Sequence, residues 1–100
     1  MSTDPNSSDE CKLTCQVAVT NGLGLHARVA ARIAETVSRY NCQVVLAKDG
    51  QEAEADSVLS LLTLDAPVGS TITVTAWGQE ASAVLDEINR MFVSGFGERE

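Results

Sequence analysis

The sequence is poor in the residues that build redox, metal and nucleic-acid sites. Its 100 residues include one histidine, three cysteines and seven lysines and arginines, against fourteen aspartates and glutamates. A net charge of −7 repels phosphate backbones and anionic lipid surfaces, so we expect neither a nucleic-acid nor a membrane partner. An odd number of cysteines without a CxxC pair, beside a single histidine, argues against a disulfide framework and a zinc site. We therefore expect core or half-buried thiols at Cys11, Cys15 and Cys42, no metal and no cofactor.

Long apolar runs are also missing. No stretch reaches the roughly 20 apolar residues that a membrane-spanning helix needs. The first ten residues, MSTDPNSSDE, are polar and acidic, whereas a secretory signal is basic and then apolar. They also contain too few apolar side chains to offset the entropy cost of ordering, which predicts a flexible tail over residues 1–10. We expect a cytoplasmic protein with one domain over residues 11–96 and a short tail at 97–100.

Hydrophobic periodicity divides the domain into seven elements. It predicts strands at residues 12–19, 43–47, 52–55 and 71–77, and helices at residues 27–40, 58–62 and 81–92. The corner Lys48-Asp49-Gly50 carries the signal of a hairpin turn. Because the strands are apolar on one side only, their sheet needs helices on a single face. The order β-α-β-β-α-β-α therefore predicts an α+β open-faced sandwich, a four-stranded, mainly antiparallel sheet with three helices on one face.

The single histidine lies in the stretch NGLGLHARVA, directly before a predicted helix. The first N–H groups of a helix have no partner within it, and the positive end of the helix dipole attracts anions. The same field opposes an imidazolium and favours the neutral ring, which can act as a nucleophile. Gly22 and Gly24 allow the backbone before His26 to turn tightly or to approach a ligand closely.

These features together describe a histidine that takes a phosphoryl group and holds it at a helix amino terminus. Arg28 offers a permanently charged fork suited to phosphate oxygens. The backbone N–H groups of Ala27, Arg28 and Val29 would complete the cradle around a group on His26. A lone histidine beside a helix start is more often a capping or surface residue, and paired glycines often make only a loop. Both interpretations stay open on the residues alone.

The segment GLHAR, residues 24–28, resembles the phosphorylation motif GLHARPA of HPr, the histidine phosphocarrier family of the bacterial phosphotransferase system. The resemblance covers residues 12–96 and includes the order of elements. The stretches EAEADSV at 52–58, LLTLD at 61–65 and SGF at 94–96 are most similar to NPr, the nitrogen-regulatory paralogue. The resemblance implies that His26 accepts phosphate on Nδ1 from phosphorylated enzyme I and passes it to an EIIA-type protein. It implies a monomeric carrier, not an enzyme, which serves sugar transport or nitrogen-type regulation and in which Arg28 steadies the phosphoryl group.

A second site is also implied by the resemblance. Ser57 stands where HPr proteins of some bacteria are phosphorylated by HPr kinase/phosphorylase, although helix capping alone explains a serine there. A docking patch for protein partners would consist of four apolar residues, if they are partly exposed: Leu25, Val58, Leu59 and Leu62. A helix that merely covers a sheet has the same apolar spacing. Two alternatives therefore remain: a regulatory binding module controlled at Ser57 without phosphocarrier turnover, and a structural domain with an incidental histidine.

Two features depart from the family pattern. Val29 stands where the motif usually has proline, and it restores an N–H that could itself reach a bound phosphate. Positions that are often lysine in HPr proteins are here Glu35, Ser38, Asp56 and Ser60. Part of the positive docking surface is therefore missing. Because charge complementarity sets encounter rate and partner choice, this change bears on which donor the carrier accepts.

Overall fold

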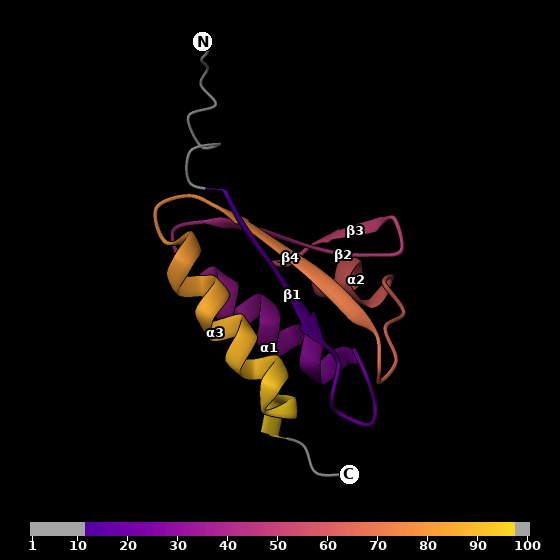
Figure 1. The fold of residues 1–100 in the computed structure, drawn as a ribbon. Coiled ribbons are helices and arrows are strands. Elements are labelled where there is room, and N and C mark those ends of the chain that lie inside the picture. Colours follow the sequence, from indigo (N-terminus) through magenta and orange to yellow (C-terminus); the bar gives the residue numbers. More distant parts are fainter. Residues whose placement is uncertain (1–11, 98–100) are drawn as a thin grey trace.

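A computed structural model describes residues 12–97 of the chain. The predicted tail at residues 1–10, Cys11 and residues 98–100 of the predicted carboxyl-terminal tail lie outside the described residues, so the domain limits stay predictions. The elements in chain order are β1 (Leu13–Ala18), α1 (Ala27–Ser38), β2 (Gln43–Lys48), β3 (Gln51–Glu54), α2 (Val58–Leu62), β4 (Thr71–Trp77), α3 (Ala81–Val93) and the 3-10 turn η2 (Gly95–Gly97) (Figure 1). All seven predicted elements are present, with ends shifted by at most two residues, and η2 is the addition.

The four strands form one sheet in the order β1-β4-β2-β3, and each neighbouring pair is antiparallel. The predicted hairpin joins β2 to β3, where Lys48 pairs with Gln51. Its two turn residues, Asp49 and Gly50, have φ angles of 53° and 84°. Two successive positive φ angles are what a type I′ turn requires, and aspartate and glycine tolerate them best. This short turn sets the register of the hairpin.

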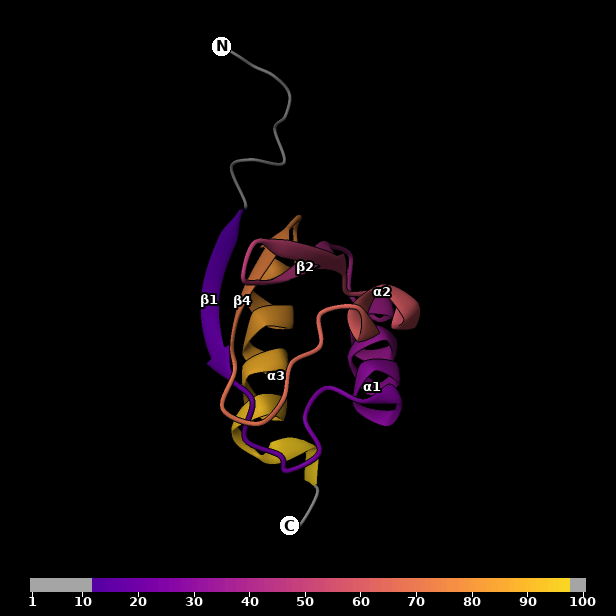
Figure 2. The ribbon, with the colours of Figure 1, turned by 90° about the vertical axis from the view of Figure 1, so that its right-hand side faces the viewer.

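One face of the sheet is buried and the other is open, as the alternation predicts. In β4 the side chains of Ile72, Val74 and Ala76 are fully buried, whereas the threonines between them are partly exposed. Helices α1 and α3 lie on the buried side, with α2 beside α1 (Figure 2). Helix α3 contacts β1 and β4, while α2 contacts α1 and β3. The predicted α+β open-faced sandwich is confirmed.

One inner position of β1 departs from the predicted pattern. Val17 is buried and Cys15 is half-buried, but Leu13, which belongs to the same side of the strand, is 42% exposed. Leu13 begins an edge strand and lines a surface groove together with Leu85 and Asp86 of α3. Helix α3 therefore covers this end of β1 incompletely.

The carboxyl-terminal segment ties α3 to the elements around the histidine. The hydroxyl of Thr20, which follows β1, donates to the carbonyl of Phe92 at 2.7 Å. Arg32 of α1 donates to the carbonyl of Phe96 at 2.6 Å. The two phenylalanine rings meet edge to face, with centroids 4.8 Å apart, and both are buried. The loop between β1 and α1 is therefore anchored at its base by the end of α3.

Candidate histidine site at the start of α1

His26 is the residue that caps the amino terminus of α1. Its backbone is extended, with φ −109° and ψ −178°, and its carbonyl accepts the first helical hydrogen bond, from Ala30 N–H at 2.8 Å. Its ring nitrogen Nδ1 accepts a hydrogen bond from the Arg28 backbone N–H at 3.3 Å. The imidazole thus plays the part that a serine or aspartate side chain usually plays at this position. Because a neutral imidazole nitrogen that accepts carries no proton, the ring proton belongs on Nε2 and the lone pair of Nδ1 faces the helix.

The loop before His26 is held by backbone contacts with the segment that follows α2. Gly24 is buried and has a φ of 71°, which favours glycine over residues with a Cβ. Leu25 N–H donates to the Ala66 carbonyl at 2.9 Å, and the Leu25 side chain is only 8% exposed. Gly22, the other glycine of the motif, lies in the exposed part of the turn. These contacts place His26 at the surface end of a well-fixed loop.

The cradle residues lie on the first turn of α1. Ala27 and Arg28 are exposed, whereas the Val29 side chain is 1% exposed and belongs to the core. The Arg28 N–H already points at His26 Nδ1. This end of the helix also carries the positive end of the dipole. The structure therefore brings the imidazole, the guanidinium-bearing residue and the helix amino terminus together, as the spacing predicts.

Ser57 caps α2 as the local sequence predicts. Its hydroxyl oxygen accepts a hydrogen bond from the Ser60 backbone N–H at 3.2 Å, and its carbonyl accepts from Leu61 N–H at 3.0 Å. Its side chain is neither buried nor fully exposed. The observed contacts of the hydroxyl are those of a helix cap.

The structure separates the four apolar residues of the predicted docking patch. Leu59 is 78% exposed, and Val58 and Leu62 are half-buried. Leu25 is buried and so does not meet the condition of exposure on which its place in the patch depended. Leu23, in the turn just before the histidine, is 68% exposed, although the predicted patch does not include it. A leucine between the two glycines of an exposed turn is the signal that could have identified it.

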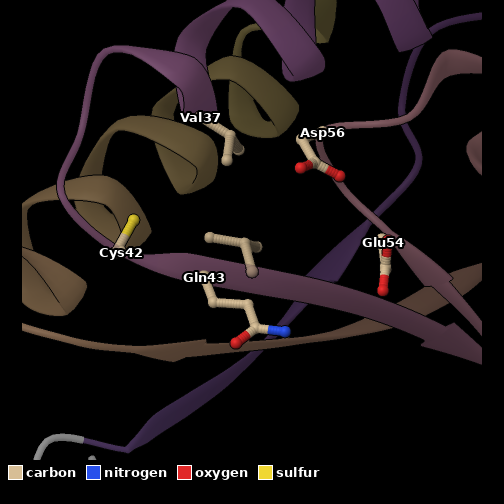
Figure 3. A pocket seen from close by; sticks show the side chains of 6 residues that line it. Val37, Cys42, Gln43, Glu54 and Asp56 are labelled. Atoms are coloured by element: carbon tan, nitrogen blue, oxygen red, sulfur yellow. The ribbon is translucent and has the colours of Figure 1, made fainter.

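A surface hollow of about 240 Å³ lies beside Val37, near the carboxyl end of α1 (Figure 3). Its lining consists of Val37, Cys42, Gln43, Val44, Glu54 and Asp56. Val37 lies about three helical turns beyond His26, or roughly 16 Å at 1.5 Å per residue. The two carboxylates of this hollow would repel a phosphoryl group, so it takes no part in the histidine site.

Two cysteines are half-buried, as expected, and Cys11 lies outside the described residues. Burial raises the pKa of the Cys15 thiol, and the negative charge of Asp86 raises it further. The pKa of the Cys42 thiol is raised in the same way, first by burial and then by Glu80. Both shifts favour the protonated thiol, which is a weaker nucleophile than the thiolate. Among residues 12–97 no three histidine, cysteine or acidic side chains come together as a metal site. Within the same residues no helix is both long and apolar enough to cross a membrane.

The model of the family described as "PTS HPr component phosphorylation site" matches residues 13–94, so the chain belongs to the HPr family of the phosphotransferase system. Proteins of this family are phosphocarriers, not catalysts, and they interact with enzyme I and with EIIA-type proteins.

Individual relatives and solved structures agree with this assignment. The chain is 40% identical to phosphocarrier protein NPr of Shewanella violacea over 87 residues, 87% of this chain and 96% of the relative. It is 42% identical to phosphocarrier protein NPr of Escherichia coli over 83 residues, 82% of this chain and 92% of the relative. The crystal structure of HPr-C-His from Thermoanaerobacter tengcongensis superposes with a TM-score of 0.84 at 26% identity, covering 88% of this chain and 99% of that one.

Proposed function

We propose that His26 is the phosphoryl acceptor of this carrier and that the phosphorus bonds to Nδ1. The observation that carries the proposal is the hydrogen bond from Arg28 N–H to Nδ1, which directs the lone pair of that nitrogen toward the amino end of α1. In the transfer, this lone pair attacks the phosphorus of phosphorylated enzyme I, and the bond to the donor breaks with its electron pair leaving on the donor. Transfer to an EIIA-type protein is the same step with His26 as the leaving group.

Once Nδ1 is bonded to phosphorus, the Arg28 N–H loses its acceptor and can donate to a phosphoryl oxygen. The N–H groups of Ala27 and Val29 lie on the same helical turn, where oriented N–H groups and the helix dipole stabilise an anion. The guanidinium of Arg28 adds positive charge that counters the charge spread over the oxygens during transfer. All of these groups come from one chain, which supports a carrier that acts as a monomer.

The docking surface proposed for enzyme I and the EIIA-type protein consists of Val58, Leu59 and Leu62, joined by Leu23. Leu59 and Leu23 are largely exposed, and apolar side chains so exposed near a site are typical of a protein contact. Asp56 and Glu35 are exposed here, at positions that are often lysine in HPr proteins. A donor that fits this chain therefore carries fewer acidic groups opposite them than a donor that docks to those lysines.

The nitrogen-type branch is favoured over sugar transport by one specific observation. The relatives named NPr are 40–42% identical to the chain, whereas those named HPr in Cupriavidus necator and Xylella fastidiosa are 30–31% identical. We propose a nitrogen-type carrier that works in the cytoplasm. Phosphorylation of Ser57 by an HPr kinase/phosphorylase is the second candidate. It is supported by the partial exposure of Ser57 and by its place at the position that is phosphorylated in some HPr proteins.

Incubation with radiolabelled phosphoenolpyruvate and a nitrogen-type enzyme I tests the proposal. Acid-labile label on the wild-type chain is the expected result, with none on His26→Asn. Asparagine is a strong helix cap, so this variant keeps α1 intact and isolates the loss of the nucleophile. Label that persists in His26→Asn, or its absence from the wild-type chain with every enzyme I of the bacterium, would contradict the proposal.

A further inference from the structure

Asn21 is a buried polar residue at the base of the loop that carries His26. Its exposed fraction is 1%, and Thr36, at 4%, is the only other buried polar side chain among the described residues. Burying an amide is costly unless it is hydrogen-bonded. The Asn21 side-chain nitrogen Nδ2 donates to the Gly24 carbonyl at 2.7 Å, and the Asn21 carbonyl accepts from Gly24 N–H at 3.0 Å. The residues from Asn21 to Gly24 therefore form a closed turn.

The Gly24 carbonyl links this turn to the histidine. The same oxygen that accepts from the Asn21 amide also accepts from the His26 backbone N–H, at 3.0 Å. A single carbonyl thus stands between a buried side chain and the backbone of the phosphoryl acceptor. Gly24 is itself buried beside the Ala66 backbone, and its carbonyl oxygen accepts from both Asn21 Nδ2 and the His26 N–H.

We propose that Asn21 is a positioning residue for phosphoryl transfer. Its amide fixes the Gly24 carbonyl, and through that carbonyl the backbone of His26, so that Nδ1 faces the first turn of α1. The amide acts through Gly24 and not on the phosphoryl group. The inference rests on the proposed role of His26 as acceptor. Small displacements of reacting atoms are costly in transfer reactions, because the rate depends on their alignment.

Two substitutions at Asn21 remove the donor in different ways. Asn21→Ala deletes the amide, and Asn21→Asp keeps its size but sets a carboxylate oxygen against the Gly24 carbonyl. Two variants serve as controls for a general loss of stability. Thr36→Val removes the other buried polar side chain, whose hydroxyl contacts Met91 Sδ at 3.6 Å, and Ile88→Val trims the core at α3.

Phosphorylation rates by enzyme I are measured at a temperature where every variant is folded. Both Asn21 variants should be phosphorylated at least about tenfold more slowly than wild type, while the two controls stay within about twofold. Nuclear magnetic resonance provides a readout that stability alone does not move. The 15N resonance of His26 Nδ1 and the Arg28 N–H resonance should shift in both Asn21 variants and stay in place in the controls.

A wild-type phosphorylation rate in Asn21→Ala would overturn the inference. So would a decrease in rate that follows the decrease in melting temperature in the same way in all four variants. If the wild-type chain takes no label, it is the proposed function that fails, and the resonance measurement then decides about Asn21 alone. Unshifted His26 and Arg28 resonances in Asn21→Ala would show that its amide does not position the imidazole.

Discussion

Gly24 and Ala66 lie in backbone contact across the base of the histidine site. A Cβ on Gly24 would come within 2.6 Å of the Ala66 carbonyl oxygen, and the neighbouring Leu25 N–H donates to that same oxygen at 2.9 Å. The loop that leads into α1 is thereby fixed to the segment that leaves α2. The two parts of the proposed function, the nucleophile and the α2 docking surface, are mechanically joined at this point.

Gly24→Ala should destabilise the fold more than a glycine substitution at an equally strained but open position. Gly50, with a φ of 84° and no atom within 4 Å of an added Cβ, provides that control. Gly50→Ala should cost only the strain of a positive φ, about 1–2 kcal/mol. Gly24→Ala adds a backbone clash and should cost at least about 1 kcal/mol more, together with slower phosphorylation. Urea unfolding measures both values, and equal losses would show that Ala66 yields to the new methyl group.

Arg28→Ala should slow phosphoryl transfer far more than it lowers stability. Arg28 is exposed on the first turn of α1, so its removal should change the free energy of unfolding by no more than about 0.5 kcal/mol. Loss of its charge from the transition state should slow transfer to His26 by about tenfold or more. Arg39→Ala is the matched control, since Arg39 is also an exposed arginine but follows the far end of α1, where it pairs with Glu35 and Glu87. Equal transfer rates in the two variants would remove Arg28 from the mechanism.

Val29→Pro should fold and should still transfer phosphate. Val29 is in the first turn of α1, where the first helical hydrogen bond is donated by Ala30, so a missing N–H breaks no helical bond. Proline can raise the free energy of unfolding by up to about 1 kcal/mol, because it restricts the unfolded chain. The loss of a buried methyl group offsets part of this gain. Thermal unfolding and a transfer assay give two separate results. An unfolded variant would show that the helix begins earlier than Ala27. A folded variant with slow transfer would show that the Val29 N–H is essential to the cradle and cannot be replaced by the N–H groups of Ala27 and Arg28.

Ser57→Asp and Ser57→Ala separate the role of Ser57 as a helix cap from its effect on the docking surface. Aspartate retains the cap and meets the positive end of α2, whereas alanine should lose about 1 kcal/mol of stability. An acidic group beside Val58 and the largely exposed Leu59 raises the cost of desolvating this apolar surface when a partner docks. Phosphorylation of His26 by enzyme I should therefore be slower in Ser57→Asp, by about twofold to tenfold, than in Ser57→Ala. Equal rates across a range of salt concentrations would show that Ser57 is a helix cap and nothing more.

The features that could be predicted from the sequence are local ones. The Asp49-Gly50 turn, the Ser57 cap and the histidine at a helix start each depend on a few neighbouring residues with marked preferences. The strict alternation in residues 71–77 likewise predicts both the strand and its buried face. These suffice for the order of elements and for the place of the histidine at the start of α1.

What could not be predicted depends on contacts between distant segments. Periodicity does not reveal that Gly24 meets Ala66, or that the Asn21 amide turns inward to bond the loop. Apolar character alone likewise cannot distinguish the buried Leu25 of the loop before α1 from the exposed Leu59 of α2. Phe96 adopts a φ of 58°, unusual for a bulky residue, because its ring is held in the core against Phe92. Tertiary packing decides each of these cases.

The most direct test of the account is to identify the nitrogen that carries the phosphorus. The chain, with 15N-labelled histidine, is phosphorylated by enzyme I and phosphoenolpyruvate and observed by 15N and 31P nuclear magnetic resonance. The account predicts a one-bond coupling between phosphorus and Nδ1 of His26, a proton that stays on Nε2, and a shifted Arg28 N–H resonance. Coupling to Nε2, or phosphorus on a residue other than His26, would contradict it.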